Sequence, residues 1–312
     1  MDAASSLSPR PFGSRIGKSR VYSYKAYGLG IHSELPLFDL PVQPKVERDV
    51  VIHIDDITVD PQKNVSAYPY EKVTPQEAVY SIEGVGRFRV LAGREITVHP
   101  VPEMDQWQAQ RYLLGLALAF LLYQRGRLVL HASAISMDGF GVAFLGDSGA
   151  GKSSIAGAFL AQGHKLVVDD ITSIEDNHSS AWLDPGFPYI KLSKAAKEMV
   201  ALNPEQLAFM DFIDDKVSYR IDRLASDERI QLKNIYVIQP GEEVGLERFN
   251  SQQALFELMR YSIPVRMVRM NHVAHFERCV ELLKYVQVFG VRRPQSLTQL
   301  SRLVDLVEEN VS

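Results

Sequence analysis

The stretch GDSGAGKSS, residues 146–154, decides how the second half of the chain folds. Its spacing completes the pattern G-x-x-x-x-G-K-[ST] through Gly146, Gly151, Lys152 and Ser153. A β-type run ending in VAFLG precedes the pattern, and a helix-forming segment follows from residue 152 to 162. Because both flanks fit, a glycine-rich turn without a ligand is the weaker interpretation. The sequence therefore predicts a phosphate-binding loop between a strand and a helix.

The chemistry of this loop indicates which cofactors to expect. Glycines allow backbone N–H groups to point at phosphate oxygens, and the N-terminus of the following helix adds partial positive charge. We expect Lys152 to reach the β- and γ-phosphates of ATP, and the Ser153 hydroxyl to coordinate Mg²⁺. The residues expected to surround the nucleotide are Gly146, Asp147, Ser148, Gly149, Ala150, Gly151, Lys152, Ser153 and Ser154.

Two carboxylates end the next predicted strand. The segment KLVVDDITSI begins at residue 165, one helix length after the loop, and its apolar start predicts a buried strand. Adjacent residues of a strand face opposite sides, so Asp169 and Asp170 should have different roles. Our interpretation is that Asp169 acts as general base beside the γ-phosphate and that Asp170 faces magnesium. The alternative is that one of them only caps the turn.

A histidine and several cations are weaker candidates. His131 lies in the strand expected to pair with the strand that leads into the loop, and only this location favours catalysis over a structural role. Some cation must neutralise the charge of a transferred phosphoryl group. The candidates are Lys191, Lys216, Arg220 and Arg223, each of which is more often a solvated surface charge.

Length and pattern predict two domains. The chain has 312 residues, of which 46% are hydrophobic, enough for sizeable cores. We expect a flexible lead over residues 1–20, a β-rich domain over 21–127 and an α/β domain over 128–312. The β-type runs lie at 21–33, 49–54, 86–93 and 94–100, and a helix over 105–125, capped by Asp105 and followed by Gly126, bridges the two halves.

Charge and composition exclude several partners. A net charge of -4 gives no general attraction to nucleic acid or to anionic membranes. The longest apolar run, residues 113–123, is shorter than the roughly 20 residues of a membrane span. Cys279 is the only cysteine, which excludes an intrachain disulfide and fits a reducing cytoplasm. We expect a cytoplasmic protein, and assembly as a homo-oligomer stays open.

The segments LHASAISMDGFGVAFLGDSGAGKSS and GHKLVVDD together resemble the HPr kinase/phosphorylase superfamily. The kinase domain of that superfamily is related in its phosphate loop to phosphoenolpyruvate carboxykinase. The resemblance implies a P-loop kinase fold, with Asp169 as catalytic base and His131 beside it. It also implies that Lys216, in DDKVSYR, is the basic partner. Where the family has a Glu-x-Arg-Gly stretch, this chain has DPGFPYIKLS, residues 184–193.

A closer similarity is to the HPr-kinase-like proteins found with lasso-peptide biosynthesis, whose first half carries segments of the types YGLGIHSELPL and GREITVHP. Such proteins phosphorylate a serine hydroxyl at the C-terminal end of a precursor peptide. The resemblance thus implies a peptide serine as acceptor. The alternatives are a kinase acting on HPr, a kinase of small-molecule hydroxyls, and an ATP-binding sensor that transfers no phosphate. The aspartate pair favours an enzyme, because a sensor needs no base beside the γ-phosphate.

Overall fold

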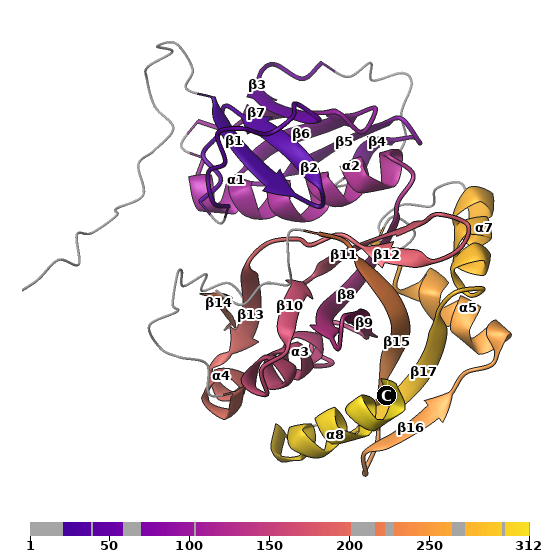
Figure 1. The fold of residues 1–312 in the computed structure, drawn as a ribbon. Helices are drawn as coiled ribbons and strands as arrows, with labels where there is room; N and C mark the ends of the chain where they lie inside the picture. The colour runs from indigo at the N-terminus through magenta and orange to yellow at the C-terminus, as the bar shows by residue number, and fades with distance from the viewer. Residues whose placement is uncertain are drawn as a thin grey trace, which may run out of the picture. The chain divides into compact units, whose positions relative to one another are not determined.

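The computed structural model describes residues 21–38, 40–58, 70–102, 104–200, 216–221, 228–263, 272–294 and 297–311, so the predicted lead over residues 1–20 lies outside the described part. The chain divides into two compact units (Figure 1). The first unit extends to Arg125, and the second begins at Gly126. Residues Ala26–Gly28, which include the last residue of β1, belong to the second unit, whereas the rest of β1 and all of β2 belong to the first.

A seven-stranded sheet forms most of the first unit (Figure 1). The predicted runs form five of its strands, and the other two, β4 and β5, were not predicted. In sheet order the strands are β1 (Tyr22–Ala26), β2 (Leu29–Ser33), β3 (Val50–Ile54), β7 (Glu95–Pro100), β6 (Gly86–Leu91), β5 (Glu77–Ile82) and β4 (Tyr70–Val73). The β2, β3 and β7 strands are parallel, and β7, β6, β5 and β4 are antiparallel.

The predicted helix after this sheet is present as three consecutive segments. These are α1 (Gln106–Tyr112), a π-helical stretch (Leu113–Ala117) and α2 (Leu118–Gln124). The Asp105 side chain caps the start by accepting from the backbone N–H of Trp107 at 2.7 Å, and Gly126 follows the end with φ +86°. This helical stretch lies within the first unit and packs on β6. None of the helices in the described residues is long and apolar enough to cross a bilayer.

The second unit is built on an eight-stranded mixed sheet. Its central strands β9, β15 and β17 are parallel, with β15 between the other two. The strands are β8 (Leu128–Met137), β9 (Phe140–Leu145), β10 (Lys165–Val168), β11 (Ile171–Asp176), β12 (Ala181–Leu183), β15 (Ile230–Pro240), β16 (Gly245–Arg248) and β17 (Gln287–Arg293). The predicted hairpin between β8 and β9 turns at Asp138 and Gly139, whose φ values of +50° and +83° suit a tight two-residue turn.

Helices and a small second sheet surround this sheet (Figure 1). They are α3 (Lys152–Ala161), α4 (Lys194–Val200), α5 (Ser251–Arg260), α7 (His272–Leu282), α8 (Leu300–Val311) and the two-stranded pair β13 (Tyr189–Ser193) and β14 (Lys216–Arg220). Stacked rings of Phe159, Phe144, Tyr236 and Phe289 run through one core cluster. That cluster fixes α3 against β9, and so holds the segment between them in place.

Candidate active site

The predicted phosphate loop connects β9 to α3. Strand β9 ends at Leu145, and α3 begins at Lys152 with Gly151 as its N-cap. Gly149 and Gly151 have φ values of +83° and +94°, a region that L side chains rarely adopt. The flanking strand and helix that the motif requires are therefore present. Phosphate binding by the loop stays a prediction.

The lysine of the motif is buried and folded back onto the loop. Only 7% of the Lys152 surface is exposed. Its Nζ donates to the carbonyl oxygens of Gly146, at 3.0 Å, and of Asp147, at 3.1 Å. The ammonium group thus lies among the loop residues, beside the N-terminus of α3. Backbone donors, one ammonium and one hydroxyl form a donor set that fits a polyphosphate with its magnesium ion.

Asp169 connects the loop to the neighbouring strands. Its Oδ1 accepts from Ser153 Oγ at 2.9 Å and from Ser133 Oγ at 2.5 Å. Its Oδ2 accepts from the Lys191 backbone N–H at 3.0 Å. The residue is 8% exposed. Burial raises the pKa of Asp169 above the usual carboxyl range, and the hydrogen bonds from Ser133 and Lys191 offset only part of this effect.

Asp170 contacts a histidine and a lysine. Its Oδ1 lies 3.0 Å from His131 Nδ1, and its Oδ2 lies 3.3 Å from Lys191 Nζ. Burial raises the pKa of Asp170, but the hydrogen bond from His131 and the Lys191 charge outweigh it and hold that pKa well below the usual range. Two adjacent carboxylates therefore have pKa values shifted in opposite directions.

The backbone explains how consecutive residues find such different surroundings. The predicted segment KLVVDDITSI forms two strands: β10 ends at Val168, just before the aspartate pair that was expected to end the strand, and β11 begins at Ile171. Asp170 lies in the interruption with φ +81°. Both strands pair with β8, and His131 and Ser133 stand two residues apart on it. Because alternate residues share a face, these two side chains contact Asp170 and Asp169 respectively.

Two contacts differ from the prediction. The histidine lies beside Asp170 rather than Asp169. Among the described residues, Lys191, from the middle of β13, contacts Asp169 with its backbone N–H and Asp170 with its ammonium group. Lys216 is at the start of β14, directly across from Ser193. Arg220 is exposed at the other end of β14, and Arg223 lies outside the described residues.

Two residues at the site belong to no sequence motif, and we did not predict them from the sequence. Ser133 could have been noticed only as the second residue after His131 on a predicted strand. Tyr27 is fully buried, and its hydroxyl donates to the Ile171 carbonyl at 2.9 Å while its backbone N–H donates to the Pro185 carbonyl at 2.9 Å. Its ring stands edge-on to Phe187 with centroids 5.3 Å apart. Through these contacts Tyr27 stabilises the position of the segment that follows the aspartates.

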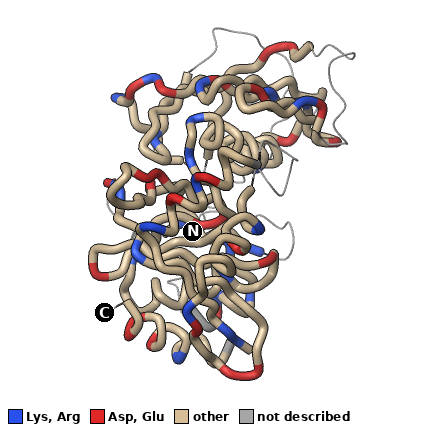
Figure 2. The backbone as a smooth tube through the Cα atoms, turned by 90° about the vertical axis from the view of Figure 1, so that its right-hand side faces the viewer, with Lys and Arg blue, Asp and Glu red and all other residues tan. Residues whose placement is uncertain are grey.

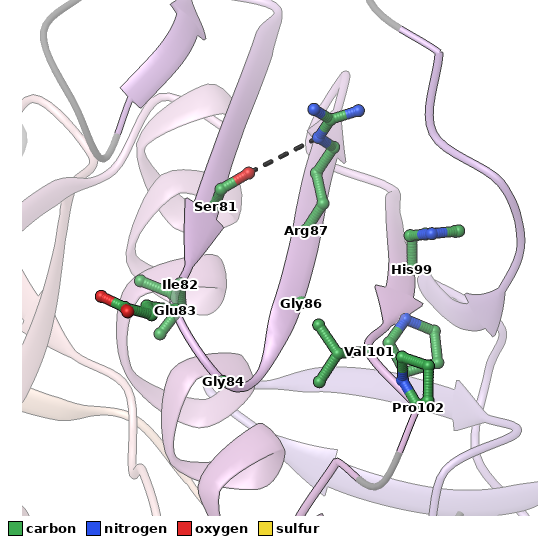
Figure 3. A pocket seen from close by; sticks show the side chains of 10 residues that line it. Ser81, Ile82, Glu83, Gly84, Gly86, Arg87, His99, Val101 and Pro102 are labelled. Atoms are coloured by element: carbon green, nitrogen blue, oxygen red, sulfur yellow. Dashed lines mark hydrogen bonds between the residues drawn. The ribbon is translucent and has the colours of Figure 1, made fainter.

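The first unit has a pocket of its own. It has a volume of about 530 Å³, and residues at the turn between β5 and β6 form part of its lining (Figure 3). Two side chains of its lining contact carboxylates: Arg87 Nε donates to Glu71 at 3.0 Å, and His99 Nδ1 lies 3.1 Å from Asp56. None of the predicted site residues lines this pocket. Over the described backbone, Lys and Arg are interspersed with Asp and Glu (Figure 2).

Comparison with known proteins identifies the second unit. The family model for the HPr serine kinase C-terminal domain matches residues 125–288, more than half of the chain. The chain belongs to this family. The match to the HPr serine kinase family includes the loop, the aspartate pair and His131, and it excludes nearly all of the first unit. The family match does not test the closer similarity to lasso-peptide kinases, which stays a prediction.

Two individual proteins are also similar. The HPr kinase/phosphorylase of Chlorobaculum tepidum is 23% identical over 146 residues, which are 47% of this chain and 38% of that protein. The chain therefore spans about two fifths of the length of this curated relative. The structure of the HPr(Ser) kinase/phosphatase from Coxiella burnetii matches with 13% identity and a TM-score of 0.32, covering 59% of this chain and 95% of the other.

Proposed function

We propose that this protein transfers the γ-phosphoryl group of ATP, with Mg²⁺, to the hydroxyl group of a serine in a peptide or protein. Membership of the HPr serine kinase family supports a phosphotransferase. The observation that carries the proposal is the hydrogen bond from Ser153 to Asp169, because it joins the phosphate loop to a buried carboxylate. A simple nucleotide-binding module requires the loop but has no use for a second, proton-accepting carboxylate beside it.

The loop is proposed to hold the polyphosphate. Lys152 would exchange its carbonyl contacts for β- and γ-phosphate oxygens, and the N–H groups at the start of α3 would donate to the same anion. Ser153 would offer its hydroxyl to Mg²⁺, and Asp170 would supply an ionised carboxylate. ATP supplies the phosphoryl group, and Mg²⁺ neutralises charge that develops on it.

The opposite pKa shifts support a division of roles between the aspartates. A carboxylate with a raised pKa accepts a proton more readily, whereas one with a lowered pKa stays ionised and suits a cation. Asp169 is therefore our candidate base, and Asp170 our candidate metal-side residue. His131 would orient Asp170 through Nδ1. Lys191 binds both aspartates, with its backbone N–H and its ammonium group, and so fixes their separation.

The proposed step can be written at named atoms. Described residues use three acceptor positions of the Asp169 carboxylate, two on Oδ1 and one on Oδ2, so a further lone pair of Oδ2 can accept a proton. The acceptor oxygen forms a bond to the γ-phosphorus while the bond to the β,γ-bridging oxygen breaks. The hydroxyl proton passes to Asp169 Oδ2, and the products are ADP and a phosphoserine.

The acceptor is proposed to be a serine near the C-terminus of a short precursor peptide, as in the lasso-associated kinases. Support comes from the sequence similarity, which includes segments of the first unit such as YGLGIHSELPL. The second candidate is the protein HPr, favoured by the family match and by the name of the Chlorobaculum tepidum relative. A small-molecule hydroxyl is a third candidate within the same reaction class.

Mass spectrometry can separate these acceptors. The protein would be incubated with ATP and Mg²⁺ together with either a set of serine-terminated peptides or folded HPr, and the added phosphate would be located by fragmentation. We expect phosphate on a peptide serine. Each peptide with its serine replaced by alanine is the matched control. Phosphorylation of HPr and of no peptide would favour the second candidate, and ATP binding without transfer to any hydroxyl would favour a sensor.

A further inference from the structure

Arg293 lies at the same edge of the sheet as the phosphate loop. The parallel strands β9 and β17 flank β15, and β9 continues from Leu145 directly into the loop. Leu145 is level with Val237 of β15, and Arg293, the last residue of β17, is level with Pro240. Ligands of α/β sheets bind outside the carboxyl ends of parallel strands. Arg293 therefore stands at the edge where a nucleotide would bind.

The guanidinium of Arg293 lies directly against the loop. A Cβ atom placed on Gly151 would be 2.4 Å from Arg293 Nη1 and 3.2 Å from Cζ, so the guanidinium would have to move to admit a side chain there. Glycines in such loops are needed because the phosphate approaches the backbone closely. At Gly149, by contrast, an added Cβ would meet nothing within 4 Å. The positively charged group thus occupies the side of Gly151 that its missing side chain leaves open.

Arg293 is also held in this position. It is 8% exposed, and its Nε donates to the Pro294 carbonyl at 3.0 Å, which orients the guanidinium plane. Burial lowers the pKa of Arg293, so the charged form is disfavoured by desolvation. A bound anion would compensate for this cost. The planar fork of arginine also matches two phosphate oxygens at once.

Two other described cations near the loop contact carboxylates. Lys191 contacts Asp170, and Arg260 donates to Asp147 at 2.7 Å from an exposed position at the end of α5. We propose that Arg293 donates hydrogen bonds to the polyphosphate of the bound nucleotide, as a phosphate-binding residue from outside the loop motif. This inference rests on the proposed function only in that the loop must bind a nucleotide.

Arg292 provides a matched control. It precedes Arg293 on β17, is exposed, and packs near Gly241 and Gly245. Substituting either arginine by glutamine removes one positive charge from the same strand. The binding of ATP, ADP and inorganic tripolyphosphate to both variants would be measured by calorimetry, with thermal melting as a check of folding. Tripolyphosphate reports on the phosphate contact without the nucleoside.

We expect Arg293→Gln to weaken ATP and tripolyphosphate binding by about 10- to 100-fold, the range for hydrogen bonds to charged groups. Arg292→Gln should bind both as the wild type does. Wild-type affinity in Arg293→Gln, or an equal loss in Arg292→Gln, would overturn the proposal. If Arg293→Gln fails to fold, Arg293→Lys is tested instead, because it keeps the charge and an alkyl stem. If Arg293→Lys binds tripolyphosphate as tightly as the wild type does, the proposed contact between the guanidinium fork and two phosphate oxygens is wrong.

The two proposals fail in different ways. If the wild type binds neither ATP nor tripolyphosphate, both are wrong. If it binds ATP and the binding depends on Arg293, but no hydroxyl is phosphorylated, the phosphate contact is supported and the kinase proposal alone is wrong.

Discussion

The Ser153 hydroxyl donates to Asp169 Oδ1 at 2.9 Å, so the residue that ends the phosphate-loop motif directly contacts a buried carboxylate just after the next strand, β10. The contact brings the expected position of Mg²⁺ next to a group able to accept a proton. Ser133, on β8, donates to the same oxygen at 2.5 Å. Ser153 of the loop and Ser133 of β8 therefore contact the same oxygen atom of Asp169, which directly follows β10.

Lys152→Ala should bind ATP at least about 100-fold more weakly, because the ammonium of this motif contacts two phosphates at once. Calorimetry with ATP and Mg²⁺ measures this. Lys165→Ala is the control, since Lys165 is exposed at the start of β10, and it should bind normally. Unchanged affinity in Lys152→Ala would remove the loop from the account.

Ser133→Ala should shift the pH dependence of transfer upward. The hydrogen bond from Ser133 lowers the pKa of Asp169, so its loss leaves that pKa higher and requires a higher pH to ionise the base. The affinity for ATP should not change. Transfer rates across pH would be compared with those of Ser136→Ala, a less buried serine of the same strand. If the acidic limb of the plot of transfer rate against pH does not shift in Ser133→Ala, this would contradict Asp169 as the base.

The two aspartates should have opposite effects on stability at neutral pH. Because the folded pKa of Asp169 is raised, its ionisation destabilises the folded protein as pH rises through that pKa. Asp169→Asn should therefore melt at or above the wild-type temperature. Asp170, with a lowered pKa, contributes stability above its unfolded pKa that is lost as pH falls through its folded pKa.

Asp170→Asn should accordingly melt at a lower temperature than the wild type at neutral pH. The loss should be about 1 kcal/mol, less than for a buried charged hydrogen bond, because the side chain is 40% exposed. Thermal melting of both variants at pH 7 and pH 4 tests the pair. The same sign of change in both variants at pH 7 would show that the two environments are not opposed.

Tyr27→Phe should slow transfer without changing ATP affinity. The substitution removes only the hydrogen bond to the Ile171 carbonyl, which costs about 1 kcal/mol and loosens the segment after Asp170. Tyr285→Phe, which removes a hydroxyl contact with Glu281 on α7, is the control. Single-turnover rates and calorimetry together make the test. Equal rates in Tyr27→Phe and wild type would limit Tyr27 to stability.

Local sequence signals predicted the parts of the site that depend on neighbours along the chain. The strand and helix around Gly151, the turn at Asp138 and Gly139, and the cap at Asp105 all follow from short patterns. The interruption at Asp170 does not, because the apolar run reads as one strand and the positive φ is fixed by contacts with β8 and β13. Backbone geometry set by tertiary contacts leaves little trace in local sequence.

Residues that reach the site from far along the chain could not be predicted either. Tyr27 lies 144 positions from the carbonyl it holds, and a Tyr-Gly pair indicates only a turn. Arg293 lies far beyond the loop, and only the parallel pairing of β9, β15 and β17 brings it there. The β4 strand was missed because it is half-buried throughout and shows no alternation.

The central claim is that Asp169 accepts the proton of the hydroxyl that is phosphorylated. Single-turnover transfer to the hydroxyl of a substrate peptide's serine, measured together with ATP affinity for the wild type, Asp169→Asn and Asp170→Asn, tests it most directly. We expect Asp169→Asn to bind ATP normally and to transfer about 10²- to 10⁴-fold more slowly, with no change in the magnesium requirement. Asp170→Asn should raise the magnesium requirement. Wild-type transfer by Asp169→Asn would contradict the claim.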